Sequence, residues 1–303
     1  MRALTLIPTL ALCGLFVFQD AEPDGRAGKT PPVTEVKAES PGSARDGSWR
    51  RSSLWDDGRA EFSAYRVLWR RYERLNPGRA FLIAVKEPWA PDLDVKADRP
   101  RPDGFDVIKL NHIRDVPTGI YTYHQMASVF MRRDDGRLRK LATTSSEGCG
   151  LSTADMTRGV LRTRSYFDGQ GNRETRWPEG ALPEDGLPLL LRDYVTGPIP
   201  ARIQVFPSLL TGRFPPLKPI AFEIRREEDI QEKVAAGTFE AVRIRLVRKD
   251  RELSFTFEKD SPHRMLRLET GDGTTYELLK SERIPYWSMN DPDGGKWIPE
   301  AIR

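Results

Sequence analysis

Four side chains near the middle of the chain could carry out nucleophilic or metal chemistry. They are His112, His124, Ser146 and Cys149. A histidine can act as a general base beside a serine hydroxyl or a thiol, and two histidines can ligate a metal. Each of these functions requires the groups to lie within hydrogen-bonding or coordination distance. The strands that carry them therefore decide which chemistry is possible.

Two turns predict the register of these strands. The segment VPTGI at residues 116–120 fits a hairpin with a three-residue loop, and its two flanking residues then face each other. Counting back along both strands places His112 directly across from His124, with Cβ atoms about 5 Å apart. The turn at residues 133–137 has the same form and places Ser146 opposite His124.

The predicted row has two chemical interpretations and one structural interpretation. His112 and His124 could ligate a metal, or a histidine could activate Ser146. No Asp or Glu joins the predicted row as a third ligand or as a group that orients the imidazole. This absence favours histidines with a structural role on a half-polar face.

The thiol of Cys149 is a second candidate nucleophile, because a nearby imidazole would activate it. In the predicted register, however, Cys149 and Glu147 point away from the histidines, on the same face as Asn111, Tyr121 and Tyr123. Asn111, Tyr121, Tyr123 and Glu147 form a candidate ligand-binding patch. Alternatively, they are a solvated group in which Glu147 lies opposite Tyr123.

Other motifs for metals, phosphates or nucleophiles are missing from the sequence. The segment Asp291–Gly295 has two spaced acids and two glycines but lacks a later acidic ligand, so we predict a turn there. The sequence contains no phosphate-binding glycine loop, zinc spacing or nucleophile elbow. We therefore expect neither a metal nor a cofactor.

The N-terminal residues predict export. One Arg precedes the apolar run Ala3–Phe18, which is typical of a signal peptide and shorter than the roughly 20 residues of a membrane-spanning helix. We predict a signal peptide at residues 1–19. Cys13 is a candidate lipidation site, although Leu12 is bulky where a small residue is expected. With Cys13 cleaved or acylated, Cys149 is the one remaining thiol, so no internal disulfide is expected.

The remainder of the chain predicts a linker and then a β domain. Residues 20–53 are rich in Pro, Gly, Ser and charge, which predicts a disordered linker. Residues 54–303 alternate apolar and polar side chains between turn signals, which predicts an antiparallel β domain. The best helix candidate is Asp185–Val195, and we expect any division into two lobes near residues 185–200. The predicted strands span residues 60–72, 79–87, 105–116, 120–131, 137–147, 157–167, 202–209, 220–226, 239–248, 252–258, 264–269 and 274–280.

The number of strands and the charge balance limit the fold and the partners. About a dozen strands favour a strongly curved sheet or a barrel-like meander, because a flat sheet that wide leaves long edges. Lys and Arg number 48 against 44 Asp and Glu, a net charge of +4, and the basic dipeptides are scattered. This distribution argues against a nucleic-acid partner.

Several segments resemble a family of exported bacterial proteins of unknown function. They are LWDDGRAEFSAY, AFLIAVKEPW, VIKLN, TGIYTY and TSSEGCG, and the resemblance covers most of residues 54–205. Some members carry the label septum formation inhibitor, a name of unrelated nucleotide pyrophosphatases whose S-x-R-R loop is missing here, so that activity is not expected. The segment AAGTFEAVR at residues 235–243 resembles exported half-barrel domains related to periplasmic lipoprotein carriers. That resemblance implies an apolar concave face.

Together these features predict an exported protein of the periplasm or cell envelope, held close to a membrane by its N-terminal segment. We expect it to bind a lipid or another apolar ligand without catalysis. Two alternatives remain open. One is a hydrolase or thiol-dependent enzyme that uses Cys149 or the row of His112, His124 and Ser146. The other is a surface or assembly scaffold that binds proteins through its strand edges.

Overall fold

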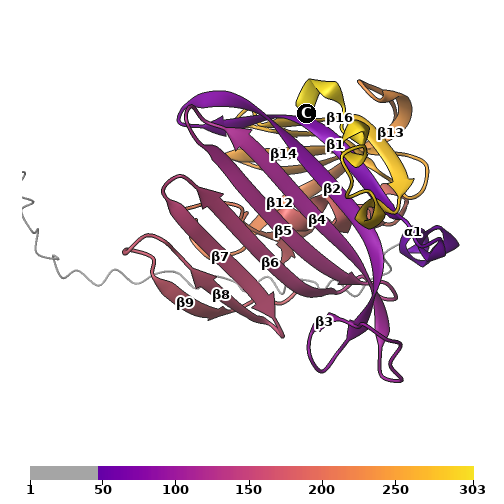
Figure 1. The fold of residues 1–303 in the computed structure, drawn as a ribbon, viewed down its shortest axis with the longest axis horizontal. Coiled ribbons are helices and arrows are strands. Elements are labelled where there is room, and N and C mark those ends of the chain that lie inside the picture. The colour runs from indigo at the N-terminus through magenta and orange to yellow at the C-terminus, as the bar shows by residue number, and fades with distance from the viewer. Residues whose placement is uncertain (1–46) are drawn as a thin grey trace, which may run out of the picture. The chain divides into compact units, whose positions relative to one another are not determined.

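The computed structural model describes residues 47–303, which are shown in colour in Figure 1. The predicted signal peptide, Cys13 and most of the predicted linker lie outside the described residues. Among residues 47–303, no helix is long and apolar enough to cross a membrane.

One sheet of 16 strands makes up most of the described chain, which confirms the predicted mainly-β fold. Neighbouring strands are antiparallel except for β10 and β11. The sheet order is β10-β11-β12-β13-β14-β15-β16-β1-β2-β4-β5-β6-β7-β8-β9, and β3 pairs with β2. The strands are β1 (Ala60–Arg71), β2 (Arg74–Ala90), β3 (Val95–Lys96), β4 (Phe105–Pro117), β5 (Thr122–Arg132), β6 (Leu138–Glu147), β7 (Gly150–Thr157), β8 (Val160–Arg164), β9 (Asn172–Arg176), β10 (Leu182–Pro183), β11 (Arg202–Phe206), β12 (Ile220–Val234), β13 (Gly237–Arg248), β14 (Arg251–Glu258), β15 (Met265–Thr270) and β16 (Thr275–Ile284).

Short helices join and flank the strands. The predicted helix at 185–195 is present as three short pieces, η2, α2 and α3. The helical elements are α1 (Ser48–Arg51), η1 (Ser53–Asp56), η2 (Glu184–Gly186), α2 (Leu187–Leu190), α3 (Asp193–Thr196), η3 (Tyr286–Ser288), η4 (Gly294–Trp297) and η5 (Glu300–Ile302).

The alternation of side chains along each strand separates an inner face from an outer face. In β5, Ala127, Val129 and Met131 are fully buried on the inner face, and the residues between them point outward. The period of two thus makes the inner face apolar across most of the sheet.

The inner faces of both halves of the sheet pack around the segment that carries α2 and α3. Leu187 and Leu189 have no exposed surface and share one core cluster with residues from β1 through β16. Gly186 allows close packing, since a Cβ there would lie 3.0 Å from a methyl group of Val129 on β5. The expected apolar concave face therefore exists, but the protein's own side chains fill it. One core spans both halves, so the described residues do not divide into lobes near 185–200.

The predicted linker ends too late, because residues from 47 onward belong to the folded domain. Trp49 is 1% exposed, and its indole Nε1 donates to Asp193 at 2.8 Å. Trp55 in turn donates to the backbone oxygen of Trp49 at 2.8 Å. The residues around Trp49 are polar, so the composition of the segment indicates a linker. Trp49 nevertheless attaches the segment to the domain, because one large aromatic side chain buries as much surface as several smaller ones.

The first of the two predicted hairpins is wrong. The second has the predicted register from His124 to Phe130, but a bulge follows, after which Met131 pairs with Leu138. Val116 pairs with Tyr123, and the loop is closed by a hydrogen bond from the Thr118 amide to the Tyr121 oxygen at 2.8 Å. The pairing is therefore shifted by an odd number of residues, which turns β4 over relative to β5. The pairing of His124 with Ser146 across β5 and β6 is as predicted.

The C-terminal segment covers part of the outer face. Ile302 and Trp297 pack with Phe81 and Ile83 of β2 in a second, smaller apolar cluster. This segment is the yellow part of the chain in Figure 1.

Candidate functional site

The structure separates the residues of the predicted histidine row. His112 pairs with Ala127, points inward and is 6% exposed, whereas His124 points outward into solvent. The predicted contact between the two histidines is wrong because of the register shift described above. Asp115, not His112, lies across from His124, and its carboxylate is 3.0 Å from His124 Nδ1.

The true row contains Asp115, His124 and Ser146 in the order of a hydrolytic triad, and so corrects the expectation that no acid joins the histidine. Three features argue against catalysis. No hydrogen bond joins His124 to Ser146 in the described structure. The carboxylate of Asp115 also binds Arg79 at 3.2 Å. None of the three residues lines either recess described below. Acyl transfer also needs oxyanion donors and a binding recess.

Cys149 lies in the turn between β6 and β7, not within a strand. It is an exposed free cysteine, and no imidazole of the described residues is hydrogen-bonded to it. A thiolate nucleophile needs a neighbour that lowers its pKa. The predicted pairing of Cys149 with a histidine base is therefore not formed in the described structure.

The predicted polar patch is half correct. Tyr121 and Tyr123 lie together, each hydrogen-bonded to the hydroxyl of Tyr72, at 3.0 and 2.6 Å. Burial raises the pKa of Tyr123, and so does hydrogen bonding of its neutral phenol with Glu147 and Tyr72. Asn111, however, is on the outer face, since β4 is turned over relative to the prediction.

The interior contains a polar network that joins the central segment to the sheet. His112 lies 3.1 Å from the hydroxyl of Tyr276 and 3.4 Å from the backbone oxygen of Asp185. Arg114 donates to Gln125 and, at 3.2 Å, to the backbone oxygen of Leu210. These groups border an interior recess of about 540 Å³.

The ionisation of this network is set mainly by burial. Burial, together with the nearby Arg114 cation, lowers the pKa of His112 to about 3, so the imidazole is neutral. Burial likewise raises the pKa of Asp185, whose carboxylate accepts hydrogen bonds from Ser208 and from the amide of Leu209. Because the members satisfy one another, the network holds the fold together and does not present a reactive group.

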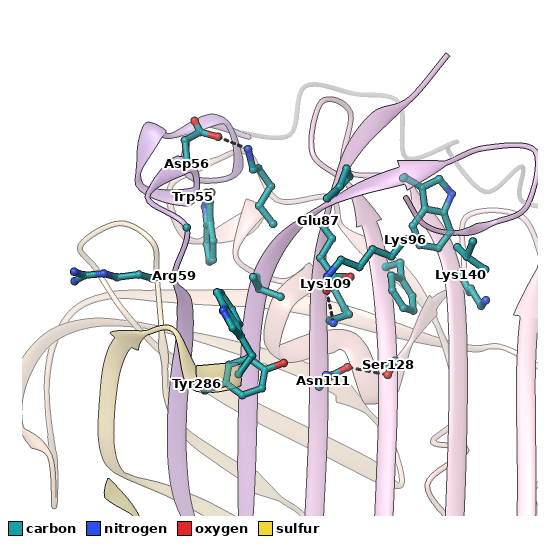
Figure 2. Close-up of a pocket in the computed structure, with 18 of the residues that line it drawn as sticks. Trp55, Asp56, Arg59, Glu87, Lys96, Lys109, Asn111, Ser128, Lys140 and Tyr286 are labelled. Atoms are coloured by element: carbon teal, nitrogen blue, oxygen red, sulfur yellow. Dashed lines mark hydrogen bonds and ion pairs between the residues drawn. The ribbon is translucent and has the colours of Figure 1, made fainter. Parts of the chain in front are cut away.

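A larger recess, here called the outer-face pocket, lies where β2, β4, β5 and β6 end beneath η1 and η3. Its volume is about 820 Å³, within the usual range for sites that hold small ligands. Figure 2 shows its lining. Apolar and aromatic side chains form one part, and lysines with two carboxylates and two small polar residues form the other.

Two of the four lysines that line the outer-face pocket share one buried carboxylate, whereas Lys86 pairs with Asp56 at 2.7 Å. Lys109 Nζ lies 2.6 Å from Glu87 Oε1, and Lys96 Nζ lies 3.6 Å from the same oxygen. Figure 2 shows these two lysines approaching Glu87 from neighbouring strands. Lys140 donates to the backbone oxygen of Asp94 at 3.0 Å. Two cations thus share one anion and a third cation has a neutral partner, so this side of the pocket is positively charged.

The apolar side of the pocket is built from aromatic rings. Trp89 and Phe130 pack with ring centroids 5.0 Å apart, and Trp287 is half exposed at the opening. The indole Nε1 of Trp89 is buried and has no acceptor among the described residues. Such orphan donors are rare in folded proteins, so the protein alone does not fully satisfy this wall.

The floor between the two sides offers further hydrogen-bond donors. Asn111 Oδ1 accepts a bond from the Ser128 hydroxyl at 2.8 Å, which leaves the Asn111 amide nitrogen directed to the pocket side of the sheet. The sequence prediction identified Asn111 but missed Lys96, Lys109 and Lys140. Their signal is weak, because they come from three strands distant in sequence and share only an outward position.

A metal site is not indicated in the described part of the chain. Residues 47–303 contain no group of three or more His, Cys, Asp or Glu side chains that could hold an ion. The segment around Asp291 and Asp293 forms a turn, as predicted, and leads into η4.

Comparison with known proteins gives little further information. No family model matches the chain, and no curated protein matches it. The crystal structure of a beta-barrel-like protein of domain of unknown function DUF1849 from Brucella abortus is similar, with a TM-score of 0.40 and 11% identity over 74% of this chain and 98% of that chain. The assignment of a function therefore depends on the residues of the outer-face pocket.

Proposed function

We propose that the protein binds an amphiphile with an acidic headgroup in the outer-face pocket, without catalysing a reaction on it. The observation that carries the proposal is the lysine group around Glu87 beside an aromatic wall, in a cavity of about 820 Å³. Ligand pockets commonly combine a largely apolar lining with a few polar groups that fix orientation.

The charges of the pocket favour an anionic headgroup. Glu87 is buried, and it holds Lys109 and Lys96 in place while neutralising only one of them. A carboxylate or phosphate placed between Lys96 and Lys140 would form charge-assisted hydrogen bonds, which are about twice as strong as neutral ones. The amide of Asn111 is available to the same headgroup. A neutral ligand would leave the excess positive charge without a partner.

The aromatic wall favours an apolar body on the ligand. Val95 and Trp287 are both exposed at the opening, and Phe130 lies deeper in the pocket. An alkyl chain or ring against these side chains would remove apolar surface from water, at about 25 cal/mol per Å². The two sides of the pocket together select a ligand that is acidic at one end and apolar at the other.

Isothermal titration calorimetry of the purified full chain tests this proposal, with oleate as probe and oleyl alcohol as its neutral counterpart. We expect saturable binding of oleate and binding of the alcohol at least about tenfold weaker. A hydrogen bond to a charged group contributes about 1.5–3 kcal/mol, and about 1.4 kcal/mol corresponds to a tenfold change in affinity. Lys96→Met and Trp287→Ala should each weaken oleate binding. The matched control is Lys259→Met, a lysine with an exposed ion pair directly after β14 that does not line the pocket. Two results would contradict the proposal. One is equal affinity for oleate and oleyl alcohol, and the other is an equal change in oleate affinity in Lys96→Met and Lys259→Met.

We also propose that the protein acts outside the cytoplasm, at the cell envelope and close to a membrane. The support is the pattern of residues 1–19, a single Arg followed by an apolar run. Fusion of residues 1–46 to an alkaline phosphatase that folds only after export tests this directly. Phosphatase activity that disappears when residues 3–18 are deleted is expected. Activity that is absent from the intact fusion would exclude export.

The two alternative functions have less support. In the described residues, neither candidate nucleophile of the enzyme alternative, Ser146 or Cys149, lines either recess. The scaffold alternative would use an exposed sheet edge, but Arg173, Glu174 and Arg176 lie on the edge strand β9. Charged side chains on an edge strand oppose pairing with another chain.

A further inference from the structure

Exposed apolar side chains gather at four turns at one end of the sheet. Because neighbouring strands are antiparallel, the β1–β2, β4–β5, β6–β7 and β8–β9 turns lie at the same end of the sheet, on the left in Figure 1. We call the side chains at these turns the hairpin rim. Its members are Tyr72, Leu75, Ile120, Tyr121, Leu151 and Tyr166.

The exposure of the hairpin rim is unusual for side chains of this kind. Ile120 is fully exposed at the tip of its loop, and Tyr72, Leu151 and Tyr166 are each more than half exposed. Single exposed apolar residues are common, but a group of them on adjacent turns marks an interaction surface.

Glycines make the hairpin rim continuous from one hairpin to the next. The ring of Tyr121 lies over Gly148 of the β6–β7 turn, where an added Cβ would be 3.1 Å from Tyr121 Cγ. The ring of Tyr166 similarly lies over Gly150, which has no room for a side chain. The aromatic rings are therefore seated on backbone and held in position before any partner binds.

Hydrogen bonds fix the polar ends of the same tyrosines. The hydroxyl of Tyr72 is 3.0 Å from that of Tyr121 and 2.6 Å from that of Tyr123, and Arg71 donates to Tyr123 at 3.1 Å. Tyrosine has an apolar body and a polar tip, and it concentrates at the boundary between water and hydrocarbon.

The charge of the same turns is positive. At these turns Arg70, Arg71, Arg74, Arg164 and Arg173 stand against Glu73, Glu147 and Asp168. Arg213, from the loop between β11 and β12, joins them because its guanidinium lies over the Phe167 ring of the β8–β9 turn. The six arginines exceed the three carboxylates, for a net charge of +3. Exposed apolar side chains with arginines around them are complementary to an anionic lipid bilayer, whose headgroups are negatively charged and whose interior is apolar.

We propose that the hairpin rim docks onto an anionic lipid bilayer, with Ile120 and the tyrosine rings at the level of the headgroups and the arginines on the lipid phosphates. This surface is separate from the outer-face pocket. Lys109 lies eight residues before Pro117 on β4, which corresponds to about 26 Å along the strand. A docked molecule would therefore keep the outer-face pocket clear of the bilayer.

Cys149 offers a local probe, because it is an exposed thiol in the β6–β7 turn beside the hairpin rim. The full chain carrying Cys13→Ser is labelled at Cys149 with an environment-sensitive nitrobenzoxadiazole dye. It is then mixed with vesicles of phosphatidylcholine, with or without phosphatidylglycerol. We expect a blue shift with the anionic vesicles, and weakening of the effect when salt is raised from about 0.1 M to about 1 M. The dye reports on the rim itself, so binding through the N-terminal segment does not mimic the result.

Matched variants complete the test. Ile120→Asp should weaken the apparent affinity for anionic vesicles at least about tenfold, because it removes one inserted aliphatic side chain and adds a negative charge. Leu93→Asp, also exposed but at the other end of β2, should have no effect. A dye placed on Leu93→Cys, with Cys149→Ser, should show no blue shift.

Three results would overturn the proposal. The first is a Cys149 dye that shows no shift although the protein sediments with the vesicles. The second is equal binding by the Ile120→Asp and Leu93→Asp variants. The third is a dimer, seen by light scattering, that is lost in Ile120→Asp while vesicle binding is absent, which would assign the rim to self-association.

Discussion

The buried position of His112 predicts a specific dependence of stability on pH. Its pKa in the folded protein is about 3, lowered by burial and by Arg114 from the ordinary value of 6.5. Below pH 6.5 the unfolded chain therefore binds a proton that the folded protein does not bind. The contribution of neutral His112 to stability is complete above pH 6.5 and is lost as the pH falls toward 3.

The size of the effect follows from the same values. At pH 5 the pH is about 1.5 units below the pKa of 6.5 that His112 has in the unfolded chain. Each unit corresponds to about 1.4 kcal/mol. His112 alone therefore lowers the free energy of unfolding by about 2 kcal/mol between pH 8 and pH 5. In His112→Gln this proton uptake is absent. The stability difference between wild type and His112→Gln should therefore shrink by about 2 kcal/mol over that range.

Urea unfolding at pH 8 and pH 5, followed by tryptophan fluorescence, measures this difference. Asp185 also has a shifted pKa, raised by burial, but it is present in both proteins and largely cancels in the comparison. His124→Gln is the control, because it removes an exposed pair with Asp115 and should change the free energy of unfolding by less than about 1 kcal/mol. A stability difference that is the same at both pH values would refute the buried, neutral state of His112.

Three further predictions test the anchors of the fold and the surface row. Arg192→Met should lower the free energy of unfolding by about 3–5 kcal/mol, because the buried Glu61 carboxylate, which lies 2.6 Å from Arg192, loses its cation. Adding Glu61→Gln should recover part of this loss in the same urea assay. Trp49→Ala should cost about 3–5 kcal/mol in that assay, whereas no loss would place the residue in a linker after all. Ser146 should not react with a fluorophosphonate in mass spectrometry of the intact protein, and labelling that Ser146→Ala abolishes would instead support the hydrolase alternative.

Long alternating segments of the sequence predicted the strands well. Residues 239–248 were predicted as a strand, and β13 spans Gly237–Arg248. Its inward residues Val242, Ile244 and Leu246 are buried, while Arg243 and Arg245 form outward ion pairs with Glu227. The alternation is a local property, since each residue's face follows from its neighbours in the chain.

The errors arose at turns. One residue more or less in a turn moves every side chain of the following strand to the opposite face of the sheet. The sequence predicts one strand over residues 157–167, but Arg158 and Gly159, both with positive φ, form a tight turn between β7 and β8. Arg158 gives no turn signal, because residues other than Gly, Asn and Asp seldom adopt that conformation. Similarly, the loop Thr118–Tyr121 is longer than predicted, so the register of β4 and β5 shifts and His112 no longer pairs with His124.

The outer-face pocket could not be predicted from local patterns. Glu87, Lys96, Lys109 and Lys140 belong to four strands, and their meeting depends on the correct register of each pairing. A single odd-numbered shift in β4 would have moved Lys109 to the interior. The aromatic wall also depends on Trp287, which comes from the far end of the chain.

The most direct test of the outer-face pocket is photo-crosslinking with a long-chain fatty acid that carries a diazirine, followed by peptide mapping. We expect saturable labelling within residues 85–96, 126–130 and 286–287, competed by excess oleate and reduced in Lys96→Met. Labelling confined to residues 207–215 beside the interior recess, or labelling that oleate does not compete, would contradict the proposed site.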